Sequence, residues 1–192
     1  MNNRIETVTG VVLAGGKSSR MGTDKAFVRV NGQPLIERSL AALRQCFTRN
    51  IIIANHGEAY RSFALPVFAD LIPNLGPIGG LQAALHHAET PAVFLVACDM
   101  PFLDPALIRA MALDDFDAVA PCVRGRYEPL HAGYARRILP VVEQQIAASR
   151  YGLQELLIRL RVRSLGEEQL QHYAGWPRSF SNVNTPADLA ID

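Results

Sequence analysis

The sequence contains few cysteines, and their arrangement argues against two classes of small protein. Only three of the 192 residues are cysteine, at Cys46, Cys98 and Cys122, and no two of them form a C-x-x-C pair. An odd number of widely spaced cysteines argues against a disulfide framework and against a zinc knuckle. We therefore expect reduced, buried thiols.

The chain also lacks a long apolar run and a strong excess of one charge. No apolar stretch approaches the roughly 20 residues that span a bilayer, and residues 1–7 lack the apolar core of a signal peptide. The formal net charge of +1 provides no general attraction to nucleic acid or to an anionic membrane. We expect a cytoplasmic protein with small ligands, no nucleic-acid or membrane partner, and a local anion site.

Length and patterning predict a single domain over residues 1–192. Hydrophobic residues make up 49% of the chain and charged residues 19%, which is ordinary for a globular protein with a substantial core. Short apolar runs alternate with helical patterns, which indicates a Rossmann-like three-layer α/β/α sandwich with a mainly parallel sheet. We predict strands at 8–13, 51–54, 66–69, 92–97, 117–121 and 180–184, and helices at 36–47, 78–88, 105–111, 136–148 and 152–160.

Residues 10–25, which begin inside the first predicted strand, have the outline of a phosphate-binding loop. Gly15 and Gly16 let the backbone approach a ligand and aim its N–H groups at it, and Arg20 and Lys25 add positive charge. In an open α/β sheet, ligands bind just past the carboxyl ends of the strands, which is where this loop is expected to lie. The glycine spacing fits neither a P-loop nor a G-x-G-x-x-G fingerprint. A solvated Gly-Gly turn with basic neighbours is the alternative interpretation.

Asp99 closely follows the most strongly strand-like run of the chain, residues 92–97. If this strand is parallel and adjacent to the first, its end lies in the same crevice as the glycine loop. A carboxylate there offers the hard oxygen that magnesium prefers, and a carboxylate that only caps the next turn is the alternative. Asn55 and Asp70 likewise stand at the ends of predicted strands.

Two segments together carry a family resemblance. Leu-Ala-Gly-Gly-Lys-Ser-Ser-Arg-Met-Gly-Thr-Asp-Lys, at 13–25, resembles the nucleotide-binding loop of nucleotidyltransferases that make nucleoside-diphosphate sugars and cofactors. Taken with Asn-Val-Asn-Thr-Pro at 182–186, the chain most closely resembles the molybdenum cofactor guanylyltransferases. The resemblance covers nearly the whole chain, and the combination of both ends is specific.

This resemblance implies transfer of GMP from GTP to the molybdenum-molybdopterin cofactor, with release of pyrophosphate and with Mg²⁺ as cofactor. It implies an N-terminal half that binds GTP, a C-terminal half that binds molybdopterin, and transient contact with proteins that make or accept the molybdenum cofactor. The catalytic residues that it implies are Arg20, Lys25 and Asp99. Its binding residues are Leu13, Ala14 and Gly15 for nucleotide contact, Gly16 for loop geometry, Arg20 and Lys25 for the triphosphate, Asp99 for magnesium, Asn55 and Asp70 for the base or ribose, and Asn182 and Asn184 for the pterin.

In such a transfer the acceptor's terminal phosphate is the nucleophile, so the protein's task is positioning and charge neutralisation. One departure concerns the base. Family members often have an asparagine at the position that matches Ile53, where an apolar side chain cannot make the polar contact. The details of guanine recognition are therefore open, with Asn55 as a substitute.

The second half of the chain carries an excess of positive charge. Between residues 124 and 163 eight arginines face only three glutamates, which indicates an anionic second substrate, or else solvated helix faces. Residues 128–134 resemble the family's strand on the acceptor side. His131 in that segment is interpreted as a hydrogen-bonding or packing residue rather than a catalytic base.

Three other functions remain open. The first two are transfer from CTP to molybdopterin and transfer from a nucleotide to a sugar phosphate, both of which the N-terminal loop alone would allow. The third is a silent nucleotide-binding or cofactor-handover module, against which Lys25 and Asp99 argue. The preference of the enzyme for one nucleotide base would distinguish the first two from the transfer of GMP to molybdopterin.

Overall fold

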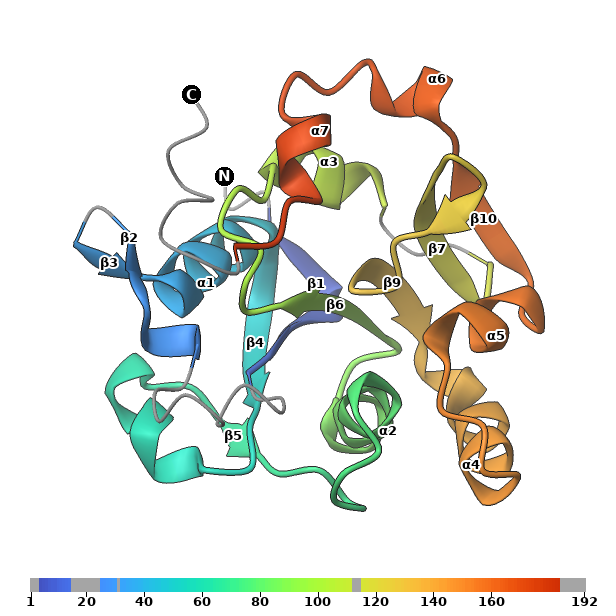
Figure 1. The fold of residues 1–192 in the computed structure, drawn as a ribbon, viewed down its shortest axis with the longest axis horizontal. Coiled ribbons are helices and arrows are strands. Elements are labelled where there is room, and N and C mark those ends of the chain that lie inside the picture. The colour runs from blue at the N-terminus through green and yellow to red at the C-terminus, as the bar shows by residue number, and fades with distance from the viewer. Residues whose placement is uncertain (1–3, 15–24, 31, 112–114, 184–192) are drawn as a thin grey trace.

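A computed structural model describes residues 4–14, 25–30, 32–111 and 115–183 (Figure 1). Across the central sheet the strand order is β10-β7-β9-β6-β1-β4-β5, and β8 pairs with β7. The bounds are β1 Ile5–Leu13, β4 Phe47–Ile53, β5 Val67–Phe68, β6 Ala92–Ala97, β7 Ala118–Val123, β8 Arg126–Tyr127, β9 His131–Ala135 and β10 Val162–Leu165. A small separate hairpin pairs β2 (Arg29–Val30) with β3 (Gln33–Pro34).

The sheet is mainly parallel, as the sequence predicts. β1 is parallel to both β4 and β6, β4 to β5, and β7 to β10. β9 runs antiparallel between β6 and β7. Val11 and Val12 of β1, on opposite faces, are both fully buried, so the sheet is covered on both sides.

Helices form the two outer layers. α1 (Leu35–Cys46), α3 (Pro105–Ala110) and α7 (Trp176–Ser179) lie above the sheet in Figure 1, while α2 (Pro77–His87), α4 (Leu139–Ala147) and α5 (Leu153–Ile158) lie below it. Each group closes its own hydrophobic cluster against the sheet. The remaining helices are η2 (Lys25–Phe27), η3 (Gly57–Phe63), η4 (Arg136–Ile138) and α6 (Glu167–Leu170). The predicted three-layer sandwich is confirmed.

Two predictions about the elements are wrong at their ends. β4 begins at Phe47, directly after α1, whereas the sequence predicts helix to residue 47 and strand only from 51. Thr48 and Arg49 are polar and exposed, so the first part of this strand lacks the apolar pattern that predicts a strand. It nevertheless pairs with β1 through its backbone. The strands β8 and β10, which contain two and four residues, are absent from the sequence prediction because they carry too little apolar pattern.

The terminal strand predicted at 180–184 does not form over its described residues, 180–183. The chain instead leaves α7 as an irregular segment whose Val183 N–H donates a 2.9 Å hydrogen bond to the Asp99 carbonyl. Val183 is buried and Asn182 is exposed. Asn184, which the sequence analysis assigns to the pterin together with Asn182, lies outside the described residues.

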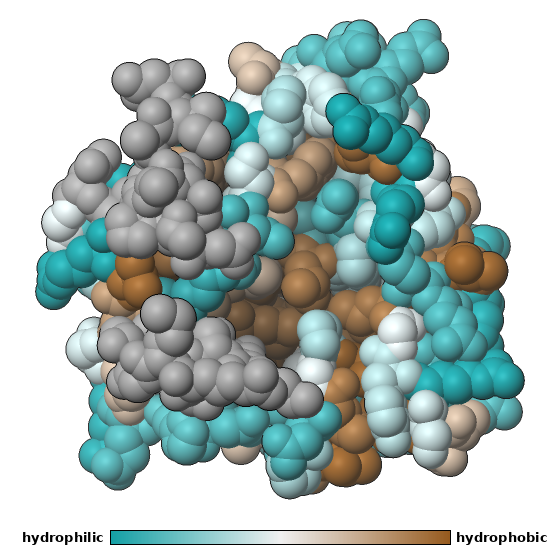
Figure 2. Space-filling model, in the orientation of Figure 1, coloured by the Kyte–Doolittle hydropathy of each residue, from teal (hydrophilic) through white to brown (hydrophobic). Residues whose placement is uncertain are grey.

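The prediction of buried thiols is confirmed for two of the three cysteines. Cys46 and Cys98 are buried free thiols and Cys122 is partly buried, and burial raises the pKa of Cys46 to about 11. No helix in the described ranges has both the length and the apolar character needed to cross a membrane. Figure 2 shows hydrophobic residues gathered in a hollow near the middle of one face, with hydrophilic residues around it.

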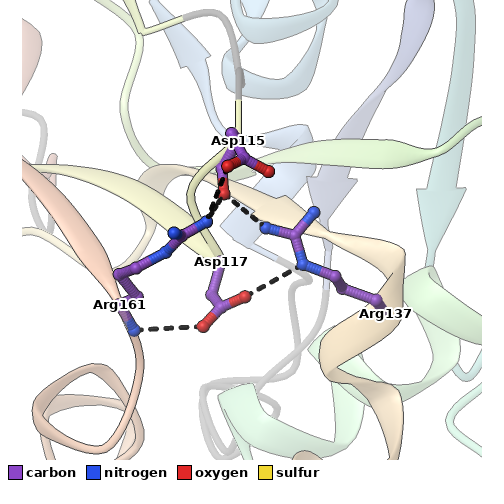
Figure 3. Close-up of polar contacts among 4 residues, drawn as sticks. All are labelled: Asp115, Asp117, Arg137 and Arg161. Atoms are coloured by element: carbon purple, nitrogen blue, oxygen red, sulfur yellow. Dashed lines mark hydrogen bonds and ion pairs between the residues drawn. The ribbon is translucent and has the colours of Figure 1, made fainter.

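At the start of β7, a polar cluster joins three elements (Figure 3). The Arg161 N–H donates to Asp117 Oδ2 at 3.1 Å and Arg137 Nε donates to Asp117 Oδ1 at 3.0 Å. Both guanidinium groups also donate to the main-chain carbonyl of Asp115. Burial pushes the pKa of Asp117 up, but the Arg161 N–H and the Arg137 guanidinium outweigh it and hold that pKa below its usual value.

We predict that Asp117→Ala lowers the free energy of unfolding by about 1 kcal/mol, because it deprives the Arg161 N–H of its acceptor. The matched control is Asp115→Ala, which keeps the carbonyl and removes a carboxylate whose side chain is 93% exposed. Urea unfolding would measure both. Equal losses for the two variants would contradict the role given to the Asp117 side chain.

His131 holds the C-terminal segment from inside the core. It is fully buried, its Nδ1 donates to the Ser179 carbonyl at 3.3 Å, and its ring meets those of Phe94 and Phe180 edge-on. Burial lowers the pKa of His131 to about 4, so the ring is neutral near pH 7. This agrees with the interpretation of His131 as a packing and hydrogen-bonding residue.

The lowered pKa of His131 predicts a specific loss of stability in mild acid. Between about pH 6.5 and about pH 4 the unfolded chain binds a proton at this residue and the folded chain does not, so stability falls as pH falls, by up to roughly 3 kcal/mol. His131→Asn keeps a donor near the position of Nδ1 and removes the titrating group. Denaturant unfolding across this pH range should show a shallower slope for the variant. Parallel curves would contradict the assignment.

Candidate active site

The site lies where the parallel strands end. The Cys98 N–H donates to the Leu13 carbonyl at 3.0 Å and the Ala14 N–H donates to the Ile53 carbonyl at 2.9 Å, so the ends of β6, β1 and β4 are held side by side. The Ala54 N–H continues the row to Phe68 of β5 at 2.8 Å. This edge is the place where ligands bind in an open α/β sheet.

Lys25 and Asp99 meet at the centre of this edge. Lys25 Nζ donates to Asp99 Oδ2 at 2.6 Å, and the two side chains are only 19% and 20% exposed. The pair joins the end of the glycine loop to the end of β6, across 74 positions of sequence. Gly15, Gly16 and Arg20 lie outside the described residues, and the structure places only Leu13, Ala14 and Lys25 of the predicted loop.

Asn55 and Asp70 form a second polar pair, at the ends of β4 and β5. Asn55 Nδ2 donates to Asp70 Oδ2 at 3.0 Å, and the Asp70 N–H donates to Asn55 Oδ1 at 3.0 Å. The amide therefore fixes the orientation of the carboxylate. Ile53 is buried in the interior with α2, so its side chain is not part of this polar rim.

The first turn of α2 approaches the same edge through two glycines. A Cβ on Gly80 would lie 2.8 Å from Leu13 Cδ2, and a Cβ on Gly79 would lie 3.1 Å from Leu75 Cβ. Both residues are buried. Close packing of the helix against β1 and against the loop that precedes the helix thus accounts for these glycines.

A cavity of about 520 Å³ opens beside the site, between the β7–β8 hairpin and α7. Its lining includes Arg124, Arg126, Tyr127, Glu128, Trp176 and Phe180. The turn at 128–130 connects it to the strand ends: the Glu128 N–H donates to Pro121 of β7 at 2.9 Å, and Ala97 of β6 donates to Leu130 at 3.3 Å. The cavity therefore adjoins the segment that carries Asp99.

The structure separates six of the eight arginines of this half by what they contact. Arg124 and Arg126 line the cavity. Arg137 and Arg161 belong to the cluster at the start of β7, Arg150 pairs with Glu155, and Arg159 donates to Gln144 and Gln145. The aromatic lining from Trp176 and Tyr127 was missed by sequence reasoning, because neither residue stands in a periodic pattern.

The donor set at this edge fits a magnesium ion shared with a nucleotide. Within the described part of the chain no group of three or more His, Cys, Asp or Glu side chains could enclose a metal. Mg²⁺ is commonly held by one or two carboxylates, together with substrate phosphates and waters. The Asp99 carboxylate, which accepts from Lys25 Nζ, is one carboxylate of the kind that such a set requires.

Comparison with known proteins agrees with this geometry. Residues 10–176 match the MobA-like NTP transferase domain. A probable molybdenum cofactor guanylyltransferase of Carboxydothermus hydrogenoformans is 34% identical, over 96% of this chain and 94% of that protein. The molybdenum cofactor guanylyltransferase of Syntrophotalea carbinolica is 35% identical, over 94% of this chain and 88% of that protein.

Structural similarity extends over the same length. The crystal structure of molybdopterin-guanine dinucleotide biosynthesis protein A from Archaeoglobus fulgidus matches with a TM-score of 0.79 and 28% identity, over 94% of both chains. The Lys25–Asp99 pair at the carboxyl edge of the sheet thus stands in a nucleotidyltransferase fold. The chain is a nucleotidyltransferase and belongs to the family of MobA-like NTP transferases.

Proposed function

We propose that this enzyme transfers GMP from GTP to the terminal phosphate of molybdopterin, releasing pyrophosphate and forming the guanine dinucleotide form of the cofactor. The observation that carries the proposal is the Lys25–Asp99 pair beside the end of β1, in a chain whose relatives over nearly its full length are named molybdenum cofactor guanylyltransferases. The acceptor phosphate oxygen attacks the α-phosphorus of GTP. The bond to the bridging oxygen breaks, and pyrophosphate leaves.

The chain's own residues position the phosphates and neutralise their charge. Lys25 is held at the reacting edge and brings its ammonium group to the triphosphate, where a preorganised cation stabilises charge in the transition state. Asp99 would hold Mg²⁺, which when bound would supply further positive charge to the phosphates. Leu13 and Ala14, at the end of β1, lie against the nucleotide, and Gly15, Gly16 and Arg20 belong to the same loop.

Guanine recognition rests on Asp70. Its carboxylate is oriented by Asn55 and can accept both the ring N–H and the 2-amino group of guanine. Cytosine offers one amino donor beside a ring acceptor, which a carboxylate repels. This arrangement explains how the chain can read guanine with an apolar residue at Ile53, and it argues against the CTP alternative.

The acceptor occupies the opposite side of Asp99. The cavity between the β7–β8 hairpin and α7 has aromatic walls and two arginines, as an anionic heterocycle requires. Asn182 is exposed one residue before the hydrogen bond from Val183 to Asp99, and we assign it to the acceptor together with Asn184. The N-terminal half thus binds GTP and the C-terminal half binds molybdopterin.

GTP should raise the thermal unfolding temperature more than CTP, UTP or ATP at equal concentration with Mg²⁺, because ligand bound only to native protein stabilises it. Asp70→Asn should reduce the shift given by GTP, since an amide nitrogen replaces one acceptor oxygen. Differential scanning fluorimetry measures all of these. A larger shift with CTP would overturn the guanylyl assignment and leave the fold intact.

Lys25→Ala should lower turnover by ~100-fold or more, the scale seen when one preorganised donor is removed. Asp99→Asn should raise the Mg²⁺ concentration needed for half-maximal turnover, because it removes an anionic oxygen that the ion prefers. Pyrophosphate release with GTP and molybdopterin is the assay, and circular dichroism controls for folding. Normal turnover in both variants would mean that the site is misplaced. A silent binding module would show no turnover in the wild-type chain or in either variant.

A further inference from the structure

Glu128 stands out in the cavity beside α7. Its side chain is half-buried, and in the residues that the structure describes the carboxylate makes no hydrogen bond or ion pair. Burial raises the pKa of Glu128, against the opposing charge of Arg126. Buried polar groups are normally hydrogen-bonded, so an acceptor placed in this way fits a ligand that brings its own donors.

The walls around Glu128 are fixed by neighbouring helices. Gln154 of α5 binds both backbone groups of Tyr127, accepting from its N–H at 3.3 Å and donating to its carbonyl. Glu167 of α6 accepts from the Arg124 N–H at 2.9 Å. The hairpin that carries the cavity's arginines is therefore held in place, which lowers the cost of ordering it around a ligand.

The shape and chemistry of the cavity suit a flat heterocycle. Trp176 and Phe180 line it from α7 and its end, with ring centroids 6.3 Å apart, and Tyr127 lines it from β8. Aromatic rings pack against planar systems by offset stacking or edge contact. The exposed Arg126 adds a cation for an anionic substituent.

We infer that Glu128 accepts the ring N–H and the 2-amino group on the 2-amino-4-oxopyrimidine edge of the acceptor's pterin, an inference that rests on the proposed function. These two donors are adjacent and parallel, and they match the two oxygens of one carboxylate in the same way as a guanidinium group does. Glu128 is then a specificity-determining residue for the acceptor.

Guanine has the same pair of adjacent donors as the pterin. The fold separates the carboxylate proposed for guanine from the one proposed for the pterin. Asp70 follows β5 on one side of Asp99, whereas Glu128 begins the turn that joins β8 to β9 on the other side. Leu130 and Ala97 are hydrogen-bonded, and each lies two residues from Glu128 or Asp99, so the Cα atoms of Glu128 and Asp99 are at most roughly 20 Å apart. Each substrate is thus read by its own carboxylate, with the reacting phosphates between them.

The test uses two ligands that differ at one group. Pterin carries the 2-amino donor, and lumazine has an oxygen at that position. Fluorescence titration of the wild-type chain should show pterin bound ~10-fold more tightly than lumazine, about one lost hydrogen bond to a charged group. Glu128→Gln should reduce this preference to about 2-fold or less, because the amide can donate to the lumazine oxygen. Glu143→Gln, an exposed matched substitution on α4, should keep the wild-type preference.

Calorimetric titration with GTP and thermal unfolding complete the design. Unchanged GTP affinity and unchanged unfolding temperature in Glu128→Gln support the inference. A wild-type chain that binds both pteridines equally, or a variant that keeps the preference, overturns it. A variant that loses GTP affinity instead assigns Glu128 to the nucleotide and also overturns it. The titration involves no turnover, so a chain that reads pterin through Glu128 but transfers no GMP would refute the proposed function alone.

Discussion

The parallel pairing of β1 with both β4 and β6 determines where this enzyme can do chemistry. Backbone hydrogen bonds from Cys98 to Leu13 and from Ala14 to Ile53 keep three strand ends level. Lys25 and Asp99, far apart in sequence, consequently meet at 2.6 Å at one edge of the sheet. The strands are buried on both faces, so this edge is a rigid support for the two side chains that we propose act on the phosphates.

The reversed strand β9 makes the second half different from the first. Because it runs antiparallel between β6 and β7, the turn at 128–130 returns the chain to the edge that carries Asp99. The cavity beside α7 lies at this turn, and Glu128 is one of the residues that line it. The opposite end of β7, with Asp117 and its arginines, ties strands together and carries no part of the proposed reaction.

The sequence predicts best what is repeated over many residues. The apolar runs of β1 and β6 and the helical face of α2 identify those elements, and topology then implies that Asp99 lies near the glycine loop. The start of β4 is hidden by Thr48 and Arg49, and α7 is too short for a periodic pattern. The arginines could not be sorted from sequence, since whether each meets Asp117 or lines the cavity depends on contacts between distant elements.

The most direct test is the product of a reaction with GTP labelled at its α-phosphate, molybdopterin and Mg²⁺. Chromatography and mass spectrometry should show the label in molybdopterin guanine dinucleotide, with one pyrophosphate released for each molecule formed, and much less product when labelled CTP replaces GTP. Label that remains in GTP, or that enters the product only from CTP, would contradict the account.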